Sequence, residues 1–207
     1  MARRTVSVEG LVDLLRSAES APITSDAIAE ILSEVDVDEA ALAPFVGFAD
    51  DHYARHLIHR DRWFDVMTLC WKPGQGTPVH THNGQLGWAK VLRGALECVE
   101  YAWLGCDRPE NQDVAGMDCL AGGAQVKLEA HAPVVAVPGG AINRVTRKVT
   151  IHSLGVPVGC NEPSVSLHVY SLPFDSCVTF DVARGACWRR ELRFDTARPG
   201  YDVALRG

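Results

Sequence analysis

Apolar residues recur at helical spacing near the N-terminus of the chain. The segment from Val6 to Arg16 carries Leu11, Val12, Leu14 and Leu15 on a recurring apolar face. Their spacing gives one continuous apolar face, which predicts an amphipathic helix. The pair Ser25-Asp26 can cap a second helix that runs through Ile28, Ile31 and Leu32. Residues 37–47 indicate a third, weaker helix.

From about residue 48 the pattern changes to short runs of β-branched and aromatic residues that are separated by Gly, Pro and Asn. The predicted strands are 52–58, 63–71, 87–92, 96–103, 124–128, 133–137, 149–154, 164–172 and 177–181. Short strands at this spacing predict a sandwich or a closed barrel. Because the strands do not alternate with long helices, a parallel α/β sheet is not expected.

We therefore predict a mainly β protein with a single domain over residues 1–207. Its parts are an N-terminal helical cap at 1–47, a small antiparallel β-barrel at 48–190 and a polar C-terminal tail at 191–207. A length of 207 residues is sufficient to bury one substantial core.

Composition narrows the class of partner. The net charge is −6 and the isoelectric point is about 5.7, and the Lys and Arg residues are scattered along the chain. Neither nucleic acid nor an anionic membrane surface is therefore an expected partner. No apolar run has the length of a membrane span or of a secretory signal, so we expect a cytoplasmic protein that binds a small molecule. We expect it to be a monomer or a weak homo-oligomer.

The segment Gly74-Gln-Gly-Thr-Pro-Val-His80-Thr-His82 carries the candidate chemistry. Side chains at positions i and i+2 of a strand leave it on the same face, so both imidazoles are expected to point into one cavity. Imidazole is a suitable ligand for divalent Fe, Zn, Cu and Ni. The spacing therefore predicts two ligands of a metal site.

This segment, followed by Gly94, resembles the first signature motif of the cupin superfamily, whose small antiparallel barrels hold a metal inside. The motif normally supplies a Glu ligand, but Gly87 stands at the corresponding position. The thiol dioxygenases, with cysteine dioxygenase as their best-known member, are the subgroup that lacks this Glu and uses only histidines. The resemblance thus implies a cupin barrel with an all-histidine site for Fe(2+).

Further segments are similar to hallmark segments of cysteine dioxygenases and occur in the family's order. They are Tyr53-Ala-Arg55-His-Leu-Ile, Leu69-Cys-Trp71, and Glu162 to Asp175. With the histidine motif they cover about residues 53 to 181. The absence of the Cys that forms a cross-link to the active-site Tyr in mammalian-type members makes this chain resemble a bacterial-type variant.

The third metal ligand that the resemblance implies is His152, which lies in Val149-Thr-Ile-His152-Ser-Leu154. An alternative comes from Pro138-Gly-Gly140-Ala-Ile-Asn143, which imitates the second cupin motif with Asn in place of His. In that register Asn143 would face the metal. Asn is a poor ligand for iron, and His152 is therefore preferred.

The resemblance also assigns residues to substrate binding. Arg55 matches the Arg that binds the substrate carboxylate in cysteine-specific members, and a planar guanidinium is suited to that group. Members that act on 3-mercaptopropionate have Gln at this position. Tyr53 matches a Tyr beside the Arg, and Trp71 matches a Trp that lines the pocket.

Ser166, His168 and Tyr170 alternate along one predicted strand and therefore share a face. The resemblance gives all three a catalytic part, as a hydrogen-bonded group whose Tyr hydroxyl reaches the metal pocket. The family's Ser-Pro-Pro after the Tyr is Ser171-Leu172-Pro173 in this chain, so we expect a cis peptide bond to be missing there.

The function that follows from the resemblance is oxidation of a thiol by O₂ to a sulfinate. The leading substrate is L-cysteine, which would give 3-sulfinoalanine. Two alternatives remain open: a dioxygenase of another small thiol carboxylate, 3-mercaptopropionate or mercaptosuccinate, and a metal-binding cupin without enzymatic activity.

Overall fold

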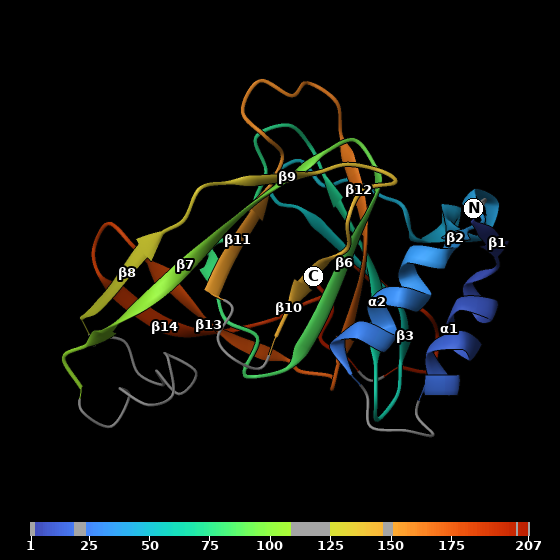
Figure 1. The fold of residues 1–207 in the computed structure, drawn as a ribbon, viewed down its shortest axis with the longest axis horizontal. Coiled ribbons are helices and arrows are strands. Elements are labelled where there is room, and N and C mark those ends of the chain that lie inside the picture. Colours follow the sequence, from blue (N-terminus) through green and yellow to red (C-terminus); the bar gives the residue numbers. More distant parts are fainter. Residues whose placement is uncertain (1–2, 19–23, 109–124, 147–150, 202, 207) are drawn as a thin grey trace.

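The structure is a computed structural model that describes residues 3–18, 24–108, 125–146, 151–201 and 203–206 (Figure 1). Residue 124 and residues 149–150, which begin two of the predicted strands, lie outside the described ranges. None of the helices in the described part of the chain combines the length and the apolar character that a bilayer span requires.

The N-terminal region contains short helices and two short strands. In order, these are β1 (Arg4–Val6), α1 (Val8–Ser17), α2 (Ser25–Glu34), β2 (Val35–Val37), α3 (Glu39–Leu42) and the 3₁₀ turn η2 (Ala43–Phe45). The first helix begins later than predicted, because Val6 pairs with Val37 in a parallel two-stranded sheet and Ser7 caps the helix. The second helix is capped by Thr24, whose hydroxyl accepts a hydrogen bond from Ala27 N, and not by Ser25-Asp26.

The remaining strands form two larger sheets. The six-stranded sheet has the order β10 (Asn143–Val145), β6 (Leu86–Arg93), β12 (Ser164–Ser171), β4 (Asp65–Trp71), β3 (Ala54–Arg60) and β15 (Thr196–Ala197). The seven-stranded sheet has the order β14 (Ala186–Glu191), β13 (Ser176–Asp181), β5 (Val79–His80), β11 (Ile151–Gly155), β7 (Leu96–Cys106) and β8 (Val126–Ala130), and β9 (Val134–Ala136) also pairs with β7.

The two sheets pack against each other through one apolar cluster. Leu57 and Met67 come from the six-stranded sheet, and Leu96 and Leu154 come from the seven-stranded sheet. Antiparallel strands that curl into two facing sheets around such a core form the cupin fold, and the predicted fold class is confirmed.

Helices α1 and α2 lie beside β6 and β3 at one side of the molecule (Figure 1). Trp88 on β6 donates a hydrogen bond from Nε1 to the carbonyl of Ser25, and Lys90 on the same strand donates to the carbonyl of Leu32. Leu167 and Val169 on β12 are buried in the cluster that contains the helices. Because the helices cover the outer face, β12 can be apolar on that face and polar on the inner one.

The segment that we predicted to be a polar tail, 191–207, contributes to the barrel. Strand β15 pairs in parallel with β3, and Phe194 is 1% exposed in the same cluster as Leu57. A single buried aromatic residue with two strand residues after it leaves no periodic pattern, which is why sequence analysis did not identify this strand.

Candidate metal centre and cavity

His80 and His152 meet because of the pairing register of two strands. Strand β5 pairs antiparallel with β11, and His80 lies directly opposite His152. Residues directly opposite each other in an antiparallel pair project their side chains to the same face. The register therefore brings together two imidazoles that are far apart in the sequence.

His82 joins them from just beyond the end of β5. Strand β5 ends at His80, so the strand that we expected to carry both histidines does not include His82. Thr81 N still donates a hydrogen bond to the carbonyl of Val178. A tight turn follows at once, with positive φ at both Asn83 and Gly84. This turn leads into β6 and leaves His82 facing the other two histidines.

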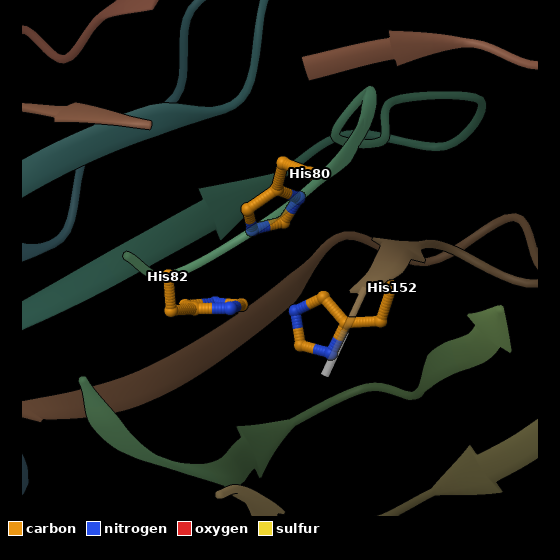
Figure 2. Close-up of side chains that lie close together, drawn as sticks. All are labelled: His80, His82 and His152. Carbon is orange, nitrogen blue, oxygen red and sulfur yellow. The ribbon is translucent and has the colours of Figure 1, made fainter. Parts of the chain in front are cut away.

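The three imidazole rings converge (Figure 2). Their centroids are 4.7 Å apart for His80 and His82, 4.9 Å for His80 and His152, and 4.7 Å for His82 and His152. One ligand atom from each residue lies within 4.8 Å of the others. Among the His, Cys, Asp and Glu side chains of the described residues, these three histidines form the group that is suited to hold a metal ion.

The protonation of these rings fits a divalent metal. Burial lowers the pKa of His80 to about 4 and the pKa of His152 well below its usual value, so both imidazoles are neutral at neutral pH. His80 donates its Nδ1 proton to the carbonyl of Pro78 at 3.0 Å, which leaves Nε2 with a free lone pair. His152 Nε2 is buried and has no hydrogen-bond partner among the described residues. A buried nitrogen without a proton donor is explained by a bound cation.

The opposite wall of the cavity comes from the six-stranded sheet. Arg55 on β3 and Tyr170 on β12 line the same cavity as His80 and His82. The metal ligands and the groups that could hold a substrate thus come from different sheets, and the fold holds them face to face.

Arg55 is a buried cation whose guanidinium forms no ion pair with a carboxylate of the described residues. Its side chain is 8% exposed, its guanidinium carbon lies 5.0 Å from the centre of the Phe194 ring, and Nη2 lies 3.5 Å from the sulfur of Met67. In the described ranges of the chain, no acidic side chain forms an ion pair with Arg55, and its buried Nε has no partner. Since an unpaired buried charge is costly, the arrangement indicates an anionic ligand.

The backbone of Arg55 is fixed by the C-terminal segment. Asp195 accepts a hydrogen bond from Arg55 N at Oδ2, 2.8 Å away, and Asp195 N donates to the carbonyl of Arg55. Oδ1 of the same carboxylate lies 2.7 Å from His52 Nε2. Although burial opposes ionisation, these hydrogen bonds lower the pKa of Asp195.

We expect Asp195→Ala to impair the substrate cavity without changing the metal site. Loss of the contacts to Arg55 and His52 should destabilise the fold by about 1–3 kcal/mol and raise KM for a carboxylate-bearing substrate by roughly 3- to 10-fold. The measurements are urea unfolding and steady-state kinetics. Asp51→Ala, which removes the exposed second partner of His52, is the matched control. An unchanged KM together with lower stability would show that Asp195 supports only the fold.

A hydrogen-bonded chain runs behind the cavity. Trp71 donates from Nε1 to Ser166 Oγ at 3.0 Å, Ser166 Oγ lies 2.8 Å from His168 Nε2, and His168 Nδ1 lies 3.1 Å from the hydroxyl of Tyr170. Since Ser166 accepts from Trp71, its own proton is available for His168 Nε2. Burial lowers the pKa of His168 to about 3, and the neutral ring then carries its proton on Nδ1 and donates it to Tyr170.

The hydroxyl of Tyr170 therefore has its own proton free to point into the cavity. Burial raises the pKa of this phenol, so the proton is retained at neutral pH. Ser166 and His168 are 0% and 1% exposed and act on the cavity only through Tyr170. Neither of them lines the cavity, and Tyr170 is the member of the chain that reaches it.

The position of Trp71 differs from our expectation that it lines the pocket. Its side chain is 0% exposed and stacks on Tyr53, with ring centroids 4.7 Å apart and planes 19° apart. Tyr53 occupies the cavity wall in front of it. Trp71 therefore lies behind the wall, where it contacts both Tyr53 and Ser166.

Among the cavity residues that sequence analysis missed are Phe174 and Cys177. The ring of Phe174 contacts those of Tyr170 and His82 at centroid distances of 5.2 and 6.2 Å. Their only signal in the sequence was their position shortly after Tyr170.

The expectation of a missing cis bond was wrong, because the Ser171–Leu172 peptide bond is cis without proline. Leu172 N donates a hydrogen bond to Gln85 Oε1 at 3.2 Å.

Comparison with known proteins decides the family. The family model described as cysteine dioxygenase type I matches residues 2–183. The chain belongs to the cysteine dioxygenase type I family. It is 27% identical over 164 residues to cysteine dioxygenase type 1 of Homo sapiens, covering 79% of this chain and 72% of that protein. It is 28% identical over 182 residues to the protein of the same name from Danio rerio, covering 86% and 82%.

Among solved structures, an RmlC-like cupin protein from Desulfovibrio desulfuricans matches with a TM-score of 0.40 and 21% identity, covering 62% of this chain and 91% of that one. As a member of the cysteine dioxygenase type I family, the protein is a cupin dioxygenase with a three-histidine metal site.

One local feature shows how this family member accommodates its departure at Gly87. Gly87 pairs with Tyr170 across β6 and β12, and a Cβ atom there would lie 3.0 Å from Cδ1 and Cε1 of the Tyr170 ring. The absence of a side chain lets the tyrosine ring approach β6 closely. A cross-link from residue 87 to Tyr170 cannot form in this chain, because glycine carries no sulfur.

Proposed function

We propose that the protein oxidises L-cysteine with O₂ to 3-sulfinoalanine at a ferrous ion held by His80, His82 and His152. In this reaction both oxygen atoms of O₂ become bonded to the substrate sulfur and the thiol proton is retained as the acidic proton of the product. Sulfur supplies all four electrons that O₂ accepts, so no separate reductant is required.

The observation that carries the proposal is a site of three imidazoles, with His80 and His152 neutral, that faces a buried guanidinium across one cavity; this guanidinium forms no ion pair with the described residues. Three histidines leave coordination positions open, and bound ferrous iron supplies the redox chemistry that activates dioxygen. The chain adds a site that can hold a small molecule beside that ion. Small thiols with a carboxylate match both features.

Arg55 would bind the substrate carboxylate. A guanidinium forms two parallel hydrogen bonds with a carboxylate, and such charge-assisted pairs are strong where water is excluded. No acidic side chain of the described residues forms an ion pair with Arg55, although Asp65 lies close enough for a coulombic interaction, so the guanidinium donors remain available for a substrate. The carboxylate would anchor one end of the substrate while the sulfur lies at the histidines.

Tyr170 would direct a hydrogen bond at the reacting end of the substrate. Its proton is free because His168 donates to the phenol oxygen, and it is held because the pKa of the phenol is raised. The ring of Tyr170 lies 5.8 Å from that of His82, centroid to centroid, which supports a role for Tyr170 beside the metal site. A fixed donor at this position stabilises charge that develops on oxygen or sulfur during the reaction.

The proposal is tested by measuring O₂ consumption of the Fe(2+)-loaded protein with a panel of thiols. L-cysteine should give the highest kcat/KM, and mass spectrometry of the product formed under ¹⁸O₂ should show two labelled oxygen atoms. The panel includes 3-mercaptopropionate, mercaptosuccinate and cysteamine. Preference for one of the first two would change the substrate and keep the reaction. Metal binding without O₂ consumption by any thiol would overturn the proposal.

A further inference from the structure

The outer nitrogen of one candidate metal ligand contacts a thiol. His152 Nδ1 lies 3.8 Å from Cys98 Sγ, and both residues are buried, with exposed fractions of 2% and 5%. The other ring nitrogen, Nε2, has no partner among the described residues and belongs to the group of three converging imidazoles. The ring of His152 is therefore contacted by sulfur on one side and faces the metal site on the other.

The contact follows from the register of β11 and β7. Leu154 lies opposite Cys98, and His152 lies opposite Glu100, so Cys98 and His152 are diagonal neighbours on one face. Diagonal pairs in an antiparallel sheet are close enough for long side chains to meet. Glu100 is exposed, so the carboxylate directly opposite His152 is turned toward solvent while the thiol is turned toward the ring.

We propose that Cys98 is a positioning residue that holds His152 as a metal ligand through an Nδ1–H···S hydrogen bond. With the proton on Nδ1, the lone pair of Nε2 is directed at His80 and His82. Histidines that bind metals generally donate their second ring proton to a carboxylate, a carbonyl or a water, and such partners fix the tautomer and the orientation of the ring. His80 has a carbonyl in this role, and His152 has a sulfur.

Asn143 provides a second contact that holds the sulfur in place. Its side chain interacts with the thiol group of Cys98. Asn143 lies on β10, in the six-stranded sheet, whereas Cys98 lies on β7 in the other sheet. Asn143, the alternative ligand in the sequence analysis, thus contacts Cys98, which in turn contacts His152. This chain of contacts connects the six-stranded sheet to the metal site.

The first test determines the tautomer of His152 in the metal-free protein. We expect ¹⁵N chemical shifts to show a predominant Nδ1–H tautomer in the wild type and a mixture of both tautomers in Cys98→Val, which preserves apolar volume and removes the hydrogen-bond acceptor. Cys98→Ala gives the same comparison if the valine variant does not fold. Cys98→Ser keeps an acceptor and should keep the wild-type tautomer.

The second test measures the affinity for Zn²⁺ by competition with a chelator. Cys98→Val and Cys98→Ala should weaken binding by about 10- to 100-fold, and Cys98→Ser should restore most of the loss. Cys70→Val is the matched control, because Cys70 is a free thiol that is 0% exposed on β4, in a different apolar cluster. Its affinity for Zn²⁺ should equal that of the wild type.

An unchanged tautomer together with wild-type Zn²⁺ affinity in Cys98→Val or Cys98→Ala would overturn the proposal, as would an equal loss of affinity in Cys70→Val. The inference depends on the three-histidine site of the proposed function but not on the identity of the thiol. Neither measurement involves O₂ or a thiol, so a failed oxidation assay and a failed test of Cys98 are distinguishable.

Discussion

Replacing His152 by alanine is expected to abolish both metal retention and thiol-dependent O₂ consumption. Two histidines cannot complete a three-ligand site, and His152 is buried against both remaining rings. Metal affinity should fall by more than about 100-fold, because loss of a direct ligand exceeds the effect of losing an outer partner. Inductively coupled plasma mass spectrometry of the purified variant and an oxygen electrode give the two readouts.

Two further variants make this result specific. His131→Ala removes an exposed histidine and should retain stoichiometric metal. Asn143→Ala tests the other register that the sequence allows, and it should also retain metal, because Asn143 is not part of the converging group. Loss of metal in Asn143→Ala together with retention in His152→Ala would show that the ligand set is wrong.

The local pattern of the sequence was sufficient to predict two of the three candidate metal ligands. His80 and His82 lie two residues apart beside a tight turn, so their convergence is a property of one short segment. The place of His152 depends on the pairing of β5 with β11, which no local pattern encodes. The family resemblance supplied that residue, and the register shows why it lies there.

The fold was predictable to the same degree. Alternating apolar runs located most of the longer strands, whereas β5 and β15, with two residues each, exist only because neighbouring strands hydrogen-bond to them. Periodicity also cannot tell which face of a strand is inner when helices bury the outer face. The expectation that Trp71 lines the pocket came from the family resemblance, and in the structure Trp71 lies behind Tyr53.

Asp195 shows a second limit of prediction from the sequence. It lies 140 residues after Arg55 in the sequence, and only the return of the chain along β3 brings its carboxylate to the backbone of Arg55. Neither residue type nor spacing signals such a contact. Sequence could identify the cation of the cavity, but only the structure shows what holds it in place.

Replacement of Arg55 is the second change for which we expect a large effect. Arg55→Ala should raise KM for L-cysteine by about 10- to 100-fold, since hydrogen bonds to a charged group contribute roughly 1.5–3 kcal/mol. Metal content should not change, because Arg55 lies on the opposite sheet from the histidines. Folding should not be impaired strongly, since the guanidinium has no ion-pair partner in the described residues whose charge would be left uncompensated.

Cysteamine, which has the amine and thiol of cysteine but no carboxylate, provides the internal control. If Arg55 binds the carboxylate, the wild type and Arg55→Ala should oxidise cysteamine with similar kcat/KM, and only the cysteine reaction should be impaired. Arg55→Lys keeps the charge and loses the planar pair of donors, so its KM for cysteine should lie between the other two. An equal loss with both substrates would instead assign Arg55 to the reaction itself or to the architecture of the cavity, and the carboxylate of the substrate would need another partner.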